Sequence, residues 1–114
     1  IFYIVNIYLK KKDMINFKNK TILITGAAGQ IGSSLAKYFH DNEANLILID
    51  NNKLKLNHLK KKIKLKNNFF YNCNLANYNT LQNLTKKIEN NFNKIDVIIH
   101  SASLVGTSKL KGWN

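Results

Sequence analysis

The sequence predicts an α/β fold, a doubly wound parallel sheet with helices on both faces. Three observations predict it: apolar runs alternate with amphipathic segments, the runs are rich in β-branched residues, and a glycine-rich turn follows the first of them. Such alternation is typical of parallel strands joined by crossover helices. Uninterrupted apolar strands are expected where both faces of the sheet are covered. With 114 residues and 45% hydrophobic residues, the chain can build one core but not two.

Four strands and three helices are expected in alternating order. The strands are placed by their apolar runs, at residues 21–25, 45–50, 69–72 and 95–100. The helices are placed by apolar residues at helical spacing, first Ile31, Leu35, Ala36 and Phe39, then Leu54, Leu56, Leu59 and Ile63, and last Leu81, Leu84, Ile88 and Phe92. The first helix is expected to run to about His40. Residues 101–114 are interpreted as a loop that enters a further element.

The chain has a formal charge of +12, from 18 basic and 6 acidic residues. Every basic residue is lysine, and arginine, whose planar guanidinium makes paired hydrogen bonds to phosphate and guanine, is absent. Abundant lysine, asparagine and isoleucine are typical of A/T-rich codons. The charge thus informs on solubility and association rather than on fold. The apolar run at residues 1–9 is too short to span a bilayer. We expect neither a nucleic-acid partner nor a membrane partner.

Residues 26–32 (Gly-Ala-Ala-Gly-Gln-Ile-Gly) lie between a strand and a helix, the context in which a glycine motif indicates a phosphate-binding turn. We expect Gly26 to allow the tight turn, Gly29 to let the backbone approach a diphosphate, and Gly32 to let the helix pack closely on the sheet. The helix N-terminus would add free N–H groups and its positive dipole end. An ATP-binding P-loop is excluded, because Ser33 occupies the position of its lysine.

An acidic residue ends the second strand. Asp50 lies 18 residues after Gly32, close to the spacing at which a carboxylate accepts hydrogen bonds from the adenine ribose. A carboxylate also repels a 2′-phosphate, so Asp50 favours NAD over NADP. Lys53 is the nearest cation that follows and could weaken this preference. The alternative is that Asp50 is a turn residue or the N-cap of the next helix.

Three features together resemble the short-chain dehydrogenase/reductase family: residues 25–32, Asp50, and residues 96–103 (Asp-Val-Ile-Ile-His-Ser-Ala-Ser). The resemblance covers roughly residues 17–107 and keeps the order and spacing of the family motifs. Gln30 replaces the middle glycine found in one branch of the family. The resemblance implies a Rossmann domain, incomplete here, with its first four strands in the order 3-2-1-4, and a nicotinamide cofactor, NAD rather than NADP.

The resemblance also implies a cofactor site. Asn74 and Leu75 fall on the pair that holds the adenine in the family, and the Asn74 amide oxygen can accept from the adenine amino group. Residues 100–103 fall on the family's Asn-Asn-Ala-Gly, of which Ala102 is kept. His100 either lines the cofactor or is a strand-end histidine satisfied by the backbone. The cofactor-binding residues expected are Gly26, Ala28, Gly29, Gln30, Ile31, Gly32, Asp50, Asn51, Asn74, Leu75, His100, Ala102 and Ser103.

No catalytic residue is expected in this chain, because the family's serine and Tyr-x-x-x-Lys pair lie beyond the fourth strand. The Tyr-x-x-x-Lys at residues 8–12 precedes the glycine-rich turn and is interpreted as chance. The family implies hydride transfer between the cofactor and an alcohol or ketone substrate, in a homo-oligomer. We expect the 114-residue chain to be inactive alone and its fourth strand to expose an apolar edge. Three scattered histidines and one cysteine do not suggest a metal site.

Several alternatives stay open. Residues 103–113 resemble family members associated with bacterial surface-sugar modification. An extended-type nucleotide-sugar epimerase or dehydratase is favoured by the His-x-Ala at residues 100–102, whereas residues 91–96 favour the other branch. A non-catalytic dinucleotide-sensing module would lack a downstream Tyr-x-x-x-Lys. A basic nucleic-acid-binding domain would show a salt-dependent affinity for DNA.

The start and compartment of the protein are also predicted. The first methionine is Met14, so residues 1–13 are interpreted as a non-native leader and residues 14–114 as the N-terminal part of an NAD(P)-binding domain. The alternative for the apolar start of the chain is the end of a truncated membrane segment. Cys73 is the single cysteine and can form no internal disulfide. Its isolation favours a reducing compartment, and we expect a cytoplasmic protein.

Overall fold

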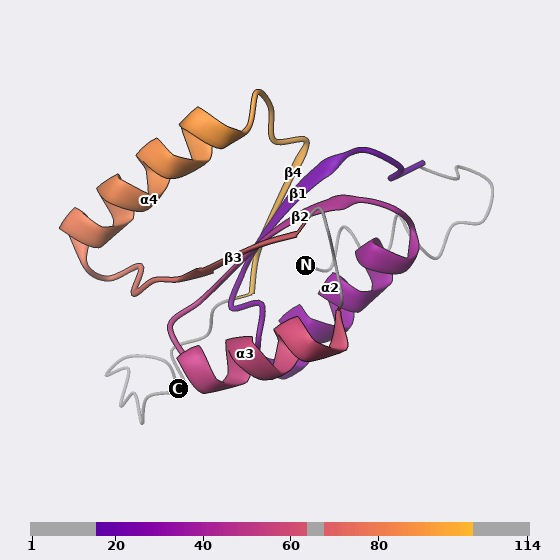
Figure 1. Cartoon of the computed structure of the whole chain (residues 1–114), viewed down its shortest axis with the longest axis horizontal. Coiled ribbons are helices and arrows are strands. Elements are labelled where there is room, and N and C mark those ends of the chain that lie inside the picture. Colours follow the sequence, from indigo (N-terminus) through magenta and orange to yellow (C-terminus); the bar gives the residue numbers. More distant parts are fainter. Residues whose placement is uncertain (1–15, 64–67, 102–114) are drawn as a thin grey trace, which may run out of the picture.

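The computed structural model describes residues 16–63 and 68–101, which form four strands and three helices in the predicted order (Figure 1). The predicted leader, residues 1–13, and the predicted loop beyond residue 101 lie outside the described part. The elements along the chain are β1 (Thr21–Thr25), α2 (Gln30–Asp41), β2 (Asn45–Asp50), α3 (Lys53–Lys62), β3 (Asn68–Asn72), α4 (Tyr78–Asn91) and β4 (Val97–His100).

The strands form one parallel sheet in the order β3-β2-β1-β4, which confirms the predicted α/β class and strand order. β1 is central and pairs with β2 from Thr21 opposite Asn45. On its other side β1 pairs with β4, with Thr25 opposite His100. The carboxyl ends of the strands therefore meet at one edge of the sheet. The chain adds β2 and β3 on one side of β1 and then returns to place β4 on the other side, so the strand order reverses between the neighbours β1 and β4.

Helices cover both faces of this sheet. In Figure 1, α2 and α3 lie on one side of the strands and α4 lies on the other. Successive side chains of a strand point to opposite faces of the sheet, so alternate strand residues belong to two separate cores. The core beneath α2 and α3 includes Ile22, Ile24, Leu46, Leu48, Ala36, Phe39, Leu56, Leu59 and Ile99. The core beneath α4 includes Leu23, Ile47, Ile49, Cys73, Leu84 and Ile88.

The helix starts differ in how they are capped. α3 and α4 each begin after an asparagine whose side-chain oxygen accepts a backbone N–H, Asn52 from Lys55 at 3.0 Å and Asn77 from Thr80 at 3.2 Å. α2 instead begins after Gly29, which has no side chain to cap it, and its first turn contains no acidic residue. The N–H groups at the start of α2 are thus left available to an anion.

Not every apolar residue of the predicted stripes is buried. Leu54 is 75% exposed and Ile31 is 56% exposed, because each lies in the first turn of its helix at the edge of the sheet. The buried stripe of α3 is therefore Leu56 and Leu59. Within the described residues, Ile98 of the outer strand β4 is 65% exposed, so the sheet is covered less completely there than at β1 and β2.

The predicted end of the last helix was also wrong. α4 ends at Asn91, and Phe92 is its C-cap, with an extended backbone at φ −132° and ψ 132°. Phe92 still packs against the core beneath α4. Its ring meets that of Phe69 edge-on, with centroids 4.6 Å apart. Phe92 is thus apolar because it packs on the same core as the buried residues of α4, although it lies after the end of that helix.

β4 begins at Val97 rather than at residue 95, because Asp96 bonds to the start of β1. The Asp96 N–H donates to the Thr21 carbonyl oxygen, and the Asp96 carboxylate accepts the Thr21 N–H, both at 2.9 Å. Lys94 Nζ lies 3.0 Å from the same carboxylate. The hydrogen bond from Thr21, and secondarily the ion pair with Lys94, lowers the pKa of Asp96.

This lowered pKa predicts how stability depends on pH. A carboxyl whose pKa is lower in the folded chain stabilises it above the unfolded pKa, and that stabilisation is lost as the pH falls through the folded pKa. Asp96→Asn should therefore lower the free energy of unfolding at neutral pH and have less effect in acid. Urea unfolding from about pH 7 to about pH 3 measures this difference. A difference that stays constant with pH would contradict the assignment, and Lys94→Met should have the smaller effect.

Candidate functional site

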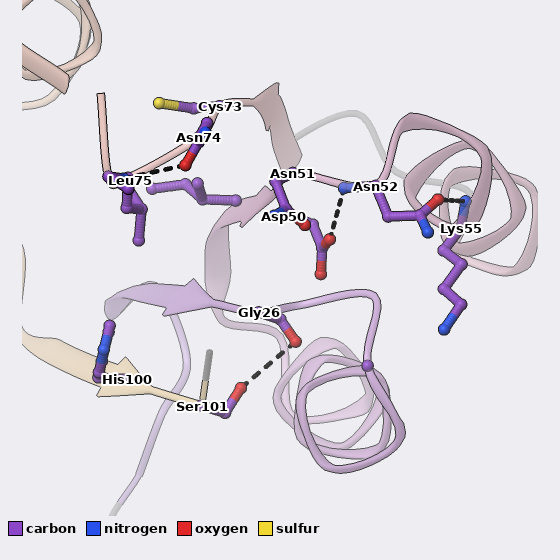
Figure 2. Close-up of a pocket in the computed structure, with 13 residues that line it drawn as sticks. Gly26, Asp50, Asn51, Asn52, Lys55, Cys73, Asn74, Leu75, His100 and Ser101 are labelled. Carbon is purple, nitrogen blue, oxygen red and sulfur yellow. Dashed lines mark hydrogen bonds between the residues drawn. The ribbon is translucent and has the colours of Figure 1, made fainter. Parts of the chain in front are cut away.

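A cavity of about 650 Å³ opens at the carboxyl edge of the sheet (Figure 2). Open parallel sheets bind ligands at this edge, where the strand order reverses. The cavity is lined by residues at or after the carboxyl ends of all four strands: Gly26, Gly29, Ile49, Asp50, Asn51, Asn52, Lys55, Cys73, Asn74, Leu75, Ala76, His100 and Ser101.

The glycine-rich turn forms one wall of the cavity. Gly26 has φ 64°, in the left-handed region that favours glycine, so the chain can leave β1 in a tight turn. The turn is then tied to its neighbours by backbone bonds. Ala27 N–H donates to the Ile49 carbonyl oxygen at 3.0 Å, and Gly29 N–H donates to the Gly26 carbonyl oxygen at 3.1 Å. These bonds hold the turn rigidly at the uncapped start of α2.

Gly32 lets α2 approach this turn. A Cβ added at Gly32 would lie 2.1 Å from the Gly26 carbonyl oxygen and 2.9 Å from Ala27 Cα. Both obstacles are backbone atoms, so the turn would have to move. At Gly29 the added Cβ would lie 3.3 Å from the Gly26 carbonyl oxygen, a tight contact that needs only a small shift. Gly32 thus lets α2 pack closely on the glycine-rich turn, whereas its predicted role was close packing on the sheet.

Asp50 links the end of β2 to the glycine-rich turn. One carboxylate oxygen accepts the Ala28 N–H at 2.9 Å, and the other accepts the Asn52 N–H at 2.8 Å. In Figure 2 the carboxylate points from β2 toward the turn. Asp50 is therefore both a turn residue, as one alternative predicted, and a cavity residue. Each carboxylate oxygen keeps a lone pair that can accept a ligand hydroxyl.

Asn74 shapes the wall that follows β3. Its side-chain oxygen accepts the Ala76 N–H at 3.0 Å, and its carbonyl oxygen accepts the Asn77 N–H at 3.0 Å. These bonds turn the chain into α4 and leave Leu75 and the buried Cys73 beside the cavity. The amide oxygen of Asn74 is thus already engaged once, although it retains a second lone pair.

The residues that follow β4 are bonded to the end of β1. The Ser101 hydroxyl donates to the Thr25 carbonyl oxygen at 2.6 Å, and the Ser101 N–H donates to the same oxygen at 3.1 Å. His100 Nδ1 lies 2.6 Å from the Thr25 hydroxyl oxygen. The histidine is therefore satisfied by a side chain, not by the backbone as one alternative predicted, while it also lines the cavity.

The structure brings most of the predicted cofactor residues together. Seven of them line the cavity: Gly26, Gly29, Asp50, Asn51, Asn74, Leu75 and His100. Ala28 joins them through its bond to Asp50. Gln30, Ile31 and Gly32 form the first turn of α2 and are not among the lining residues. Ala102 and Ser103 lie outside the described residues.

Sequence reasoning missed the cation at this site. Lys55, rather than Lys53, lines the cavity, and its ammonium makes no ion pair within residues 16–63 and 68–101. In Figure 2 the Lys55 side chain extends from α3 on the same side as the Asp50 carboxylate. The signal that could have found it is Asn52, a typical N-cap residue, which places Lys55 in the first turn of a helix.

Two features are absent from residues 16–63 and 68–101, the part of the chain that the structure describes. No group of three or more histidine, cysteine, aspartate or glutamate side chains there could hold a metal ion. No helix there is both long enough and apolar enough to cross a membrane.

Comparison with known proteins assigns the family. The short chain dehydrogenase family profile matches residues 20–113. The chain is 39% identical over 92 residues to the 3-oxoacyl-[acyl-carrier-protein] reductase FabG of Rickettsia typhi. The matched residues make up 80% of this chain and 36% of that relative. The chain thus spans about a third of the length of the curated relatives that it matches first.

Solved structures agree with this fold. A short chain dehydrogenase from Bacillus anthracis is 25% identical, with a TM-score of 0.69 over 76% of this chain and 36% of that chain. An oxidoreductase from Haemophilus influenza, solved with bound NAD, is 30% identical, with a TM-score of 0.63 over 73% of this chain and 30% of that chain. A family match over most of the sequence, on a sheet with this strand order, makes the chain a member of the short-chain dehydrogenase family.

Proposed function

We propose that the cavity binds a nicotinamide dinucleotide, with NAD preferred over NADP. The observation that carries the proposal is the 2.9 Å bond between the Asp50 carboxylate and the Ala28 N–H. It fixes an acceptor suited to ribose hydroxyls against a turn suited to phosphates, the two groups that lie next to each other in the cofactor. The NAD bound to the 30%-identical Haemophilus influenza oxidoreductase supports the same assignment.

The start of α2 would receive the diphosphate. Its first-turn N–H groups, from Gln30 to Gly32, have neither a side-chain cap nor an acidic neighbour in that turn. A helix N-terminus of this kind favours anions through both its N–H groups and its dipole. Gly26 and Gly29 let the backbone approach the ligand without a side chain between them. The charge of the diphosphate is then met by the backbone, not by lysine.

The adenosine half would occupy the cavity between β2 and β3. Asp50 accepts from the ribose hydroxyls, and its negative charge disfavours a 2′-phosphate. Asn74 can receive the adenine edge through the second lone pair of its amide oxygen, while Leu75 offers an apolar surface. Asn51 and His100 complete this half of the site. Ala102 and Ser103 stay in the proposal from the family resemblance alone.

For the complete protein we propose an oxidoreductase of alcohol or ketone substrates. The bound nicotinamide supplies the hydride chemistry, and the residues of this chain bind and orient the dinucleotide. We expect binding without turnover from the 114 residues, since none is assigned a catalytic role. A surface-sugar substrate, a cytoplasmic location and a homo-oligomer remain parts of the proposal. A nucleotide-sugar epimerase or dehydratase and a non-catalytic sensor are the alternatives, distinguished by whether a downstream Tyr-x-x-x-Lys exists.

Calorimetric titration tests the proposed function. NAD and AMP should both bind saturably, because AMP carries the ribose and adenine that the cavity is proposed to hold. The NAD affinity should weaken only modestly when the salt concentration rises, since backbone groups and one carboxylate make the contacts. Binding of DNA with a steep salt dependence, and no binding of NAD, would instead support a basic nucleic-acid-binding domain.

Lys55 should set the remaining affinity for NADP. Lys55 lines the same cavity as Asp50, so its ammonium can meet a 2′-phosphate. Lys55→Ala is expected to weaken NADP binding about 3- to 10-fold, the effect of one partly solvated ion pair, and to leave NAD binding nearly unchanged. Lys53→Ala is the control, because it removes the same charge from a residue that does not line the cavity. Equal effects of the two variants would contradict a specific role for Lys55.

A further inference from the structure

Thr25 and His100 end the two neighbouring strands β1 and β4, and they pair in register. The Thr25 hydroxyl oxygen lies 2.6 Å from His100 Nδ1. Thr25 is buried, with 7% of its surface exposed. His100 is exposed at the cavity, and Figure 2 shows it across the cavity from Asn74 and Leu75. A buried hydroxyl thus holds the ring of a cavity histidine.

The burial of Thr25 decides where the protons lie. A buried hydroxyl needs an acceptor for its own proton, because an unpaired buried donor loses its hydrogen bond to water without replacement. Within the described residues, His100 Nδ1 is the acceptor that the Thr25 hydroxyl meets. If Nδ1 carried a proton, the hydroxyl would have to accept, and its own proton would have no partner. The Thr25 hydroxyl therefore donates to Nδ1, which places the ring proton on Nε2.

We infer that Thr25 is a positioning residue that fixes His100 in the Nε2–H form, so that His100 donates a hydrogen bond to the adenosine half of a bound dinucleotide. This inference rests on the proposed function. With Nδ1 engaged, Nε2 is the polar ring atom left to face a ligand. Ser101, the other polar residue at the end of β4, already donates its hydroxyl to Thr25.

The surrounding residues point to the adenosine half. The same cavity is lined by Asp50 from β2 and by Asn74 and Leu75 after β3. Asp50 offers acceptors only, so it matches ribose hydroxyls and cannot satisfy the ring nitrogens or ring oxygen of adenosine. Those atoms accept hydrogen bonds. An Nε2–H group supplies the donor that Asp50 lacks.

Nitrogen NMR of the ligand-free protein tests the proton assignment. Long-range ¹H–¹⁵N correlation of the side chain at neutral pH should report His100 as the Nε2–H tautomer, with the signal assigned by its loss in His100→Asn. Thr25→Val, nearly isosteric and without the hydroxyl, should give a mixture of tautomers. Thr25→Ser should restore the wild-type signature. An Nδ1–H tautomer in the wild-type protein would overturn the inference, whether or not the variants fold.

Calorimetry with AMP tests the ligand contact. His100→Ala and Thr25→Val should each weaken AMP binding about 3- to 10-fold, as expected for one hydrogen bond, and Thr25→Ser should bind like the wild type. His58→Ala, which alters an exposed histidine of α3 outside the cavity, is the control. Unchanged AMP affinity in His100→Ala would overturn the inference while the proposed function stands. No AMP or NAD binding by the wild-type chain would instead overturn the proposed function, and the ligand contact with it.

Discussion

Replacing Gly32 with alanine should destabilise the chain by about 3 kcal/mol or more, at the upper end of the range for overpacked sites. The added Cβ would lie 2.1 Å from the Gly26 carbonyl oxygen, inside any allowed contact. The obstacle is the backbone of the glycine-rich turn, which is itself bonded to β2 through Ala27 and Ile49. A small domain has a total stability of about 5–15 kcal/mol, so the variant would lose a large share of its free energy of unfolding and would unfold at a much lower urea concentration.

Urea unfolding followed by circular dichroism measures this effect, and Gly29→Ala is the matched control. At Gly29 the added Cβ lies 3.3 Å from the same Gly26 oxygen, so a shift of a few tenths of an ångström relieves it. Gly29→Ala should cost about 1 kcal/mol or less by the same reasoning. The predicted order would be contradicted if Gly32→Ala unfolded at the same urea concentration as Gly29→Ala.

Replacing Asp50 with alanine should weaken NAD binding about 10- to 100-fold, as expected for the loss of hydrogen bonds to a charged acceptor. Two effects combine. The ribose hydroxyls lose their acceptor, and the Ala28 and Asn52 N–H groups lose their partner. The glycine-rich turn is then no longer held against β2, so the phosphate contacts also weaken.

Calorimetric titration with NAD measures the loss, and two variants separate its causes. In Asp50→Asn one carboxylate oxygen becomes an NH₂ group, which cannot accept a hydrogen bond. The remaining amide oxygen can still accept one backbone N–H, so the NAD affinity should fall to a value between those of the wild type and Asp50→Ala. Asp41→Ala removes the same charge from an exposed residue at the far end of α2 and should leave binding unchanged. If Asp41→Ala weakened binding as much as Asp50→Ala, net charge rather than the site would be responsible.

The fold was largely predictable because its strands are short apolar runs with few competing interpretations. β1 and β2 begin and end at the residues expected from the sequence. The errors occur where one side chain overrides the pattern. Phe92 is apolar at helical spacing, but it is buried by Phe69 after the helix has ended. Asp96 reads as part of a strand, although its hydrogen bonds to Thr21 delay the start of β4.

The residues of the recognised motifs could be predicted from the sequence, but the contacts that join these residues to one another could not. Gly26 was found because the glycine-rich turn lies between a strand and a helix, and Asp50 was found by its spacing of 18 residues from Gly32. The Asp50–Ala28 bond, the Thr25–His100 bond and the place of Lys55 were not, since each joins residues through the register of the sheet or the phase of a helix. A one-residue change in that phase would point Lys55 elsewhere.

The central claim is that the glycine-rich turn and Asp50 form one dinucleotide site, and amide chemical-shift mapping during titration with NAD tests it most directly. Saturable shifts should concentrate in three segments that contain cavity residues, 26–32, 50–55 and 74–76, and should be small at the end of α4, residues 86–91. The same titration of Asp50→Ala should need far more NAD to reach saturation. Shifts confined to the lysine-rich surface of α3 and abolished by salt, or no saturable shift at all, would contradict the account.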